Sequence, residues 1–198
     1  FSYRIELPYD VPSGGNPLTV GIASHRVPAD YRYFTVPKLG SRAYLTARIS
    51  EWGRYNLLPG DANLFLENTY VGRSTINPQS VSDTLSFSLG RDQSIVVDRE
   101  KLEEFEERNF FGNRVTQSFA WEISIRNTKE QPVRIEVNDQ VPVSQHEDIE
   151  VSLTEDSGAE YNRQTGMLRW VLQMSPGQTR TLRFEYEVEY PRGRRISF

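Results

Sequence analysis

Hydrophobic and polar side chains alternate over two long stretches of this chain, and that alternation restricts its fold more than any other feature. Between residues 115 and 125, apolar side chains take every second position except Gln117, and polar residues fill most of the positions between them. Between 182 and 190, apolar residues alternate with charged ones without a break. A period of two places one set of side chains on a buried face of a sheet and the other on a solvated face. Both stretches therefore predict long, half-buried β-strands.

Shorter stretches with the same character occur along the rest of the chain and predict further strands. They lie at 1–7, 20–22, 31–36, 45–49, 64–66, 84–89, 95–97, 133–138 and 167–172. Polar segments containing Asn, Pro or Gly separate several of them, at 127–132, 162–166 and 175–177, which is the chemistry that tight turns require. Short strands joined by such turns predict an all-β protein, folded as an antiparallel β-sandwich.

The alternation is less regular in the first half of the chain than in the second, which predicts two β-lobes. We place an irregular N-terminal β-lobe at residues 1–113 and a more regular sandwich lobe at 114–198. The segment 98–108 departs from the pattern, because its composition favours a short helix while predicted strands flank it on both sides. We expect this segment to be extended or disordered, with a short helix as the alternative.

The composition excludes several classes of function. The net charge of −4, from 27 acidic and 23 basic residues, argues against a nucleic-acid partner, because binding to phosphates requires a strongly basic surface. The chain contains no cysteine, so thiol catalysis and thiolate metal sites are excluded. No apolar stretch approaches the roughly 20 residues that a membrane-spanning helix needs, and we expect no membrane-spanning segment.

Residues that carry catalysis are scarce in this sequence. The two histidines, His25 and His146, lie in different halves of the chain. His146 has Ser144 and Glu147 close by, but neighbouring residues of an extended chain point to opposite faces, so the segment SQHED does not assemble a catalytic triad on its own. The sequence has no pattern of metal ligands and no phosphate-binding loop. We therefore predict no catalytic residue, no metal site and no cofactor.

Two routes to carbohydrate chemistry remain open. The first is a pair of carboxylates about 5–9.5 Å apart, as in glycoside hydrolases, because any two of the 27 acidic residues can meet in the folded chain. The second is a row of exposed aromatic rings that stack on sugars. We name Tyr31, Tyr33 and Trp52 as candidate ligand-binding residues, since Trp52 follows a predicted strand and precedes a glycine, where exposure is expected. Trp121 and Trp170 lie in apolar strands and are expected in the core.

Several blocks of the sequence resemble, in the same order, the C-terminal domain of bacterial proteins of the mucoidy inhibitor A-like family. The blocks are YRYFTVPKLGSRAYLTARISEWGRYNLLPGDANLFLENTYVG at 31–72, TLSFSLGRD at 84–92, EISIRN and PVRIEVNDQVPVS within 122–144, TGMLRW at 165–170 and FEYEVEYPRG at 184–193. The resemblance implies an exported parent protein, in which an N-terminal β-domain and a coiled coil precede this domain. It implies an extracytoplasmic location, periplasmic or associated with the cell envelope, and it brings no catalytic residues.

The second half of the chain is also similar to immunoglobulin-like modules of bacterial surface proteins. This similarity implies an immunoglobulin-like sandwich at 114–198, and such modules act mostly as spacers or binding platforms. We therefore expect a non-catalytic cell-envelope module that binds a protein partner or a polymer. The alternatives are a carbohydrate-binding module and a glycoside hydrolase that acts on polysaccharide with paired carboxylates.

Overall fold

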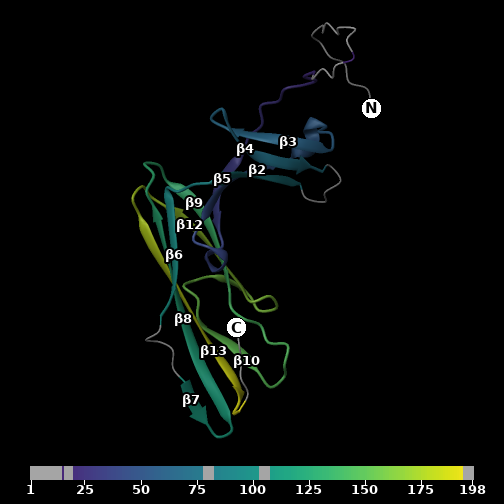
Figure 1. Cartoon of the computed structure of the whole chain (residues 1–198). Coiled ribbons are helices and arrows are strands. Elements are labelled where there is room, and N and C mark those ends of the chain that lie inside the picture. The colour runs from purple at the N-terminus through teal and green to yellow at the C-terminus, as the bar shows by residue number, and fades with distance from the viewer. Residues whose placement is uncertain (1–14, 16–19, 78–82, 103–107, 194–198) are drawn as a thin grey trace.

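Two packed β-sheets form most of the molecule. The structure, a computed structural model, describes residues 15, 20–77, 83–102 and 108–193. In Figure 1 the long strands β8 and β13 run side by side along much of the molecule, and β9 and β12 lie across their upper part. The all-β fold predicted from the alternation is confirmed. Among the described residues, no helix has the length and apolar character needed to cross a bilayer.

The first sheet has six strands in the order β11-β12-β9-β1-β2-β5. Their bounds are β1 Asp30–Thr35, β2 Ala43–Ser50, β5 Thr84–Arg91, β9 Val133–Gln140, β11 Glu160–Asn162 and β12 Met167–Met174. The pairings in this sheet are antiparallel except that of β1 with β9, where Tyr33 lies beside Ile135 in a parallel register.

The second sheet has five strands and contains the two longest ones. Its order is β10-β13-β8-β6, and β7 also pairs with β8. The bounds are β6 Ile95–Lys101, β7 Arg108–Phe111, β8 Arg114–Asn127, β10 Glu150–Glu155 and β13 Thr179–Pro191. Strands β8 and β13 are the two that the sequence predicted most clearly, and they pair antiparallel over their whole shared length.

A separate hairpin and two 3₁₀ turns complete the fold. Strands β3 Gly60–Leu66 and β4 Thr69–Ile76 pair only with each other. Glu67 and Asn68 join them with φ values of 48° and 66°, the left-handed pair that a tight two-residue hairpin turn requires. The 3₁₀ turns are η1 Pro37–Leu39 and η2 Trp52–Tyr55.

The inward faces of both sheets form one continuous core. Ile123 and Phe184 of the second sheet are fully buried, and Ile135 and Trp170 of the first sheet belong to the same cluster. Trp170 is thus in the core as predicted, and its indole N–H donates to the carbonyl oxygen of Asp156 at 2.9 Å. Trp121 is half-buried and packs against the cluster.

The structure differs from the sequence expectations at residues 20–22, and two other segments lie wholly or partly outside the described residues. The strand expected at 20–22 is wrong, because residues 20–29 form no strand and two alternating apolar residues are too few to specify one. The strand expected at 1–7 lies outside the described residues. Of the segment 98–108, residues 98–101 are extended in β6 and residue 108 begins β7, while 103–107 lie outside the described residues.

The division into lobes at residue 113 and the immunoglobulin-like character of the second lobe stay predictions. Main-chain hydrogen bonding crosses that boundary in both sheets. Strand β1 pairs with β9 in the first sheet, and β6 pairs with β8 in the second. The two halves of the chain therefore share both sheets and one core.

Candidate binding groove

The predicted aromatic residues Tyr31, Tyr33 and Trp52 do not form an exposed row. Trp52 and Tyr33 are each 7% exposed, whereas Tyr31 is 57% exposed. The expected exposure of Trp52 is wrong, because Glu51 adopts a left-handed backbone with φ of 52° and the η2 turn that follows buries the indole. Tyr33 is buried because the alternation of β1 directs it toward the core. A sugar-binding role for these three residues stays a prediction. Their side chains do not form the continuous exposed surface that ring stacking needs.

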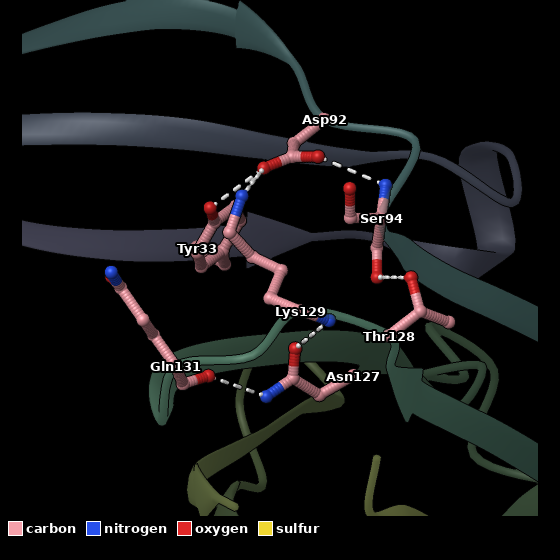
Figure 2. A network of polar contacts seen from close by, with 7 residues as sticks. All are labelled: Tyr33, Asp92, Ser94, Asn127, Thr128, Lys129 and Gln131. Carbon is pink, nitrogen blue, oxygen red and sulfur yellow. Dashed lines mark hydrogen bonds and ion pairs between the residues drawn. The ribbon is translucent and has the colours of Figure 1, made fainter. Parts of the chain in front are cut away.

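Tyr33 instead belongs to a polar network (Figure 2). Its hydroxyl donates to Asp92 Oδ2 at 2.7 Å, and Lys129 Nζ donates to the same oxygen at 2.8 Å. The amide of Ser94 donates to Asp92 Oδ1 at 2.9 Å. Partial burial is the largest single influence and pushes the pKa of Asp92 upward, but the hydrogen bonds from Lys129, Tyr33 and Ser94 outweigh it and hold that pKa at about 2. The network ties β1 to the turns before β6 and after β8.

Asn127 extends this network into the turns at the ends of β8 and β12. The residue is fully buried, and its Oδ1 accepts a hydrogen bond from the amide of Lys129 at 3.0 Å. Its Nδ2 donates to the carbonyl oxygens of Gln131 at 3.0 Å and Ser175 at 3.1 Å. Because a buried amide of this kind has its hydrogen bonds satisfied within the protein, we interpret the network as structural.

A buried ion pair joins the two sheets. Arg99 of β6 donates from Nε to Asp139 Oδ2 at 2.8 Å and from Nη2 to Asp139 Oδ1 at 3.2 Å. The Asp139 side chain is fully buried and that of Arg99 is 12% exposed. The guanidinium also lies 3.6 Å from the centre of the Trp121 ring, in cation–π geometry. Both charges are occupied with each other, so this pair is a structural element.

A groove of about 380 Å³ opens between the edges of the two sheets. Its lining comes from the β9–β10 connection, from the start of β10, and from β11 with the turn that follows it. The apolar part of the lining consists of Pro142, Val143, Ile149, Val151 and Tyr161, and Arg163 lines the groove from the turn after β11. The volume lies at the lower end of the range of about 300–1,000 Å³ that is typical of ligand sites.

The SQHED segment forms part of this groove. Ser144 Oγ donates to the carbonyl oxygen of His146 at 3.1 Å and accepts from the amide of His146 at 3.0 Å. These contacts use the main chain of His146, as expected for a polar turn. Glu147 and Glu150 line the groove as well, and both are exposed. Within the described part of the chain, no group of three His, Asp or Glu side chains can hold a metal ion.

Strand β10 forms the edge of its sheet beside the groove. It pairs with β13 on one side, and no described strand pairs with it on the other. Val151 and Leu153 are half-buried and pack against the core, while Glu150 and Ser152 are exposed. A β-bulge between Leu153 and Glu155 interrupts the register, so the regular part of the edge is residues 150–153.

The outer face of the six-stranded sheet carries a second exposed feature. Phe34 of β1 and Tyr44 of β2 are directly opposite each other, and each is 37% exposed. Glu136 of β9 lies beside Phe34 on the same face. The pair is a small aromatic surface, and exposed Val171 of β12 lies on the same face, opposite Glu136.

The sheets and the groove define an all-β domain with an accessible sheet edge next to a partly apolar cleft. The chain belongs to the family described as domain of unknown function DUF4139, which matches residues 1–192. A similar curated protein is Protein F37C4.5 of Caenorhabditis elegans, which is 21% identical over 209 residues. That match covers 99% of this chain but 38% of the nematode protein, so the chain spans well under half of this relative's length.

Sequence reasoning did not find the groove residues. Val143 and Ile149 flank the SQHED segment and were a local signal, because apolar residues on both sides of a polar turn have to pack somewhere. Tyr161 is far from them in the sequence and reaches the groove only because β11 pairs with β12 at the edge of the other sheet. Strand order is non-local, so the alternation of a single segment does not reveal which strand will be an edge.

Proposed function

We propose that this domain is a non-catalytic module that binds an extended segment of a protein partner along the free edge of β10. The observation that carries the proposal is the position of the groove, which is lined by Val151 of edge strand β10 and by Tyr161 of edge strand β11. An added strand gains main-chain hydrogen bonds from the edge, and alternate side chains can enter an adjacent pocket for specificity.

The details of the edge support selective binding. Natural edge strands are protected by charge, bulges and short length, and β10 has a bulge between Leu153 and Glu155 together with exposed Glu150. Residues 150–153 remain regular and adjoin the groove. The neighbouring edge strand β11 has three residues, which offers too few main-chain groups for a stable pairing.

A hydrolytic role for the groove has less support. Glu147 and Glu150 are its two carboxylates, and both are exposed. A general acid in a glycoside hydrolase needs a carboxyl group that stays protonated near neutral pH, and burial is the usual means of achieving this. Neither groove carboxylate has that environment, so the binding function is preferred to the enzymatic one.

The proposal is tested by selecting peptides on the folded domain and mapping a selected peptide by amide chemical shifts. We expect perturbations at residues 150–153 and in the groove, and about tenfold weaker binding in Tyr161→Ala, which corresponds to about 1.4 kcal/mol. Tyr70→Ala is the matched control, since Tyr70 is 52% exposed on the separate β3–β4 hairpin. Selected peptides that shift only residues away from β10, or a domain that selects none, would refute strand addition.

A carbohydrate-binding role is a second candidate, favoured by the Phe34 and Tyr44 pair rather than by the residues predicted from the sequence. Two exposed rings directly opposite each other on a sheet give a flat apolar surface to which a sugar ring can bind. A glycan array probed with the domain and with Tyr44→Ala tests it. Binding that is lost in Tyr44→Ala supports this role, and an array without signal removes it.

We further propose that the parent protein is extracytoplasmic and belongs with the mucoidy inhibitor A-like proteins, with a β-domain and a coiled coil upstream of this domain. The ordered sequence blocks support the family and the location, and the greater length of the nematode relative supports further domains in the parent protein. Fractionation of the full-length protein in its own cell checks the location, and recovery in the cytosol alone contradicts it.

A further inference from the structure

Glutamates face one another across the outer side of the five-stranded sheet. Glu150 lies opposite Glu189, and Glu155 lies opposite Glu185, in the pairing of β10 with β13. Like charges directly opposite each other on neighbouring strands are destabilising. This part of the sheet therefore carries an electrostatic cost that the packing of the core does not require.

In these pairs, the described cations of the domain form ion pairs with the glutamates of β13 only. Arg114 forms an ion pair with Glu189, and Arg183 forms one with Glu185. Among the side chains that the structure describes, Glu150 forms no ion pair. Glu187 lies between the two paired glutamates on β13 and accepts a hydrogen bond from the Ser118 hydroxyl at 3.3 Å. Glu150 at the free edge of β10 is thus without an ion-pair partner, although Arg163 lines the groove beside it.

The two sides of an added strand would meet different surroundings. Side chains pointing outward would lie beside exposed Glu150 and Ser152, with Glu187 one strand further into the sheet. Side chains pointing inward would face the groove, whose apolar lining includes Val151 and Tyr161. Successive residues of a strand point to opposite faces, so the edge distinguishes odd from even positions of its ligand.

Resting on the strand addition proposed above, we infer that the bound segment alternates basic and apolar residues. Lys or Arg at the outward position opposite Glu150 supplies the ion-pair partner that this carboxylate lacks, and an apolar residue at the inward position enters the groove. Cross-strand pairs of opposite charge stabilise a sheet where like pairs destabilise it. The partner is therefore a protein with an exposed or unfolded segment of this alternating pattern.

A second copy of this domain does not fit the same edge. Antiparallel pairing of residues 150–153 with the same segment of a second copy would place Glu150 of both copies on one outer face of the joined sheet. This arrangement repeats the like-charge contacts already present with β13, and charge at an edge is a known device against self-association.

The test uses three labelled peptides of equal length in which Val alternates with Lys, with Thr or with Glu. Fluorescence anisotropy measures their dissociation constants from the folded domain at two salt concentrations. The charge pair added at Glu150 predicts that the Lys peptide binds about 1.4- to 5-fold more tightly than the Thr peptide, and that the difference shrinks at high salt. The Glu peptide should bind more weakly than both.

Charge reversal at the edge locates the effect. The double variant Glu150→Lys with Glu187→Lys should invert the order of the Lys and Glu peptides. Glu100→Lys is the matched control, because Glu100 is exposed on β6 at the other edge of the same sheet, and it should leave the order unchanged. Circular dichroism verifies that each variant is folded.

The outcomes separate the two proposals. Equal binding of the Lys and Thr peptides at β10 overturns the basic pattern and leaves strand addition intact. Absence of binding by all three peptides, together with failed peptide selection, overturns strand addition itself. The inference is also overturned if Glu100→Lys abolishes the preference for the Lys peptide while the double variant at Glu150 and Glu187 keeps it. A dimer in sedimentation that forms through β10 would overturn it as well.

Discussion

Removing the carboxylate of Asp139 should destabilise the domain by about 3 kcal/mol, within the range of 3–5 kcal/mol typical for breaking a buried ion pair. The change Asp139→Ala leaves the guanidinium of Arg99, 12% exposed in the intact pair, without its two hydrogen bonds. We place the loss at the lower end of the range because the stacking of Arg99 on Trp121, at 3.6 Å, remains. A loss of this size is a large part of the total stability of about 5–15 kcal/mol expected for a domain.

Equilibrium unfolding in urea, followed by tryptophan fluorescence and circular dichroism, measures this loss. Asp98→Ala is the matched control, since Asp98 is next to Arg99 on β6 but is exposed; it should change the free energy of unfolding by less than about 0.5 kcal/mol. The double variant Arg99→Met with Asp139→Leu removes both charges and should recover most of the loss, because apolar pairs often replace buried ion pairs without cost.

Two results would refute this reasoning. A loss below about 1 kcal/mol in Asp139→Ala would mean that solvent or another group satisfies Arg99 after the carboxylate is removed. A double variant as unstable as the single one would mean that the unpaired cation of Arg99 is not the cause of the loss in stability. Equal unfolding slopes in urea are needed for either comparison, because the slope reports the surface exposed on unfolding.

Two further predictions concern a close backbone approach and a carboxylate. Gly166→Ala should cost more than about 1 kcal/mol, because φ is +72° and a Cβ would lie 2.2 Å from the Val141 carbonyl oxygen; Gly177→Ala, with φ of +69° and no atom within 4 Å, should cost less in the same urea titration. The pKa of Asp92, about 2 against an ordinary 3.8, means that its ionised form stabilises the fold above pH about 4. About 2 kcal/mol should be lost as the pH falls from about 4 to about 2, and Asp92→Asn should lack that part of the acid titration. An acid titration identical in both proteins would contradict the second prediction.

The strands could be predicted from the sequence where alternation is long. Strand β13 was predicted because each charged residue stands between two apolar ones, and the buried Phe184 and Val188 confirm that pattern. The parallel pairing of β1 with β9 could not be predicted, because the residues that meet, Tyr33 and Ile135, are about a hundred positions apart. Alternation specifies which face of a strand is buried and contains no information about its neighbours.

The site was harder to predict than the fold for a related reason. Trp52 was expected to be exposed from its position after a strand, but Glu51 adopts a left-handed conformation and Trp52 is buried in the 3₁₀ turn that follows. The network of Asp92 and Lys129 joins turns that are distant in the sequence. Single charged residues in turns look alike in a sequence, whether they are solvated or hydrogen-bonded to one another.

Alternate residues of β13 contribute to the core and to the acidic outer surface, so a substitution on the outer surface can change binding without changing the core. On β13, Phe184 and Val188 point into the core while Glu187 points outward between them. An outward substitution such as Glu187→Lys therefore leaves the buried contacts of the strand in place, and relieving like-charge contacts should not weaken the fold. The like-charge contact of Glu150 with Glu189 has a cost in stability, and we infer that these carboxylates serve another purpose. At the edge beside β10, that purpose is best explained by a basic segment that completes the sheet.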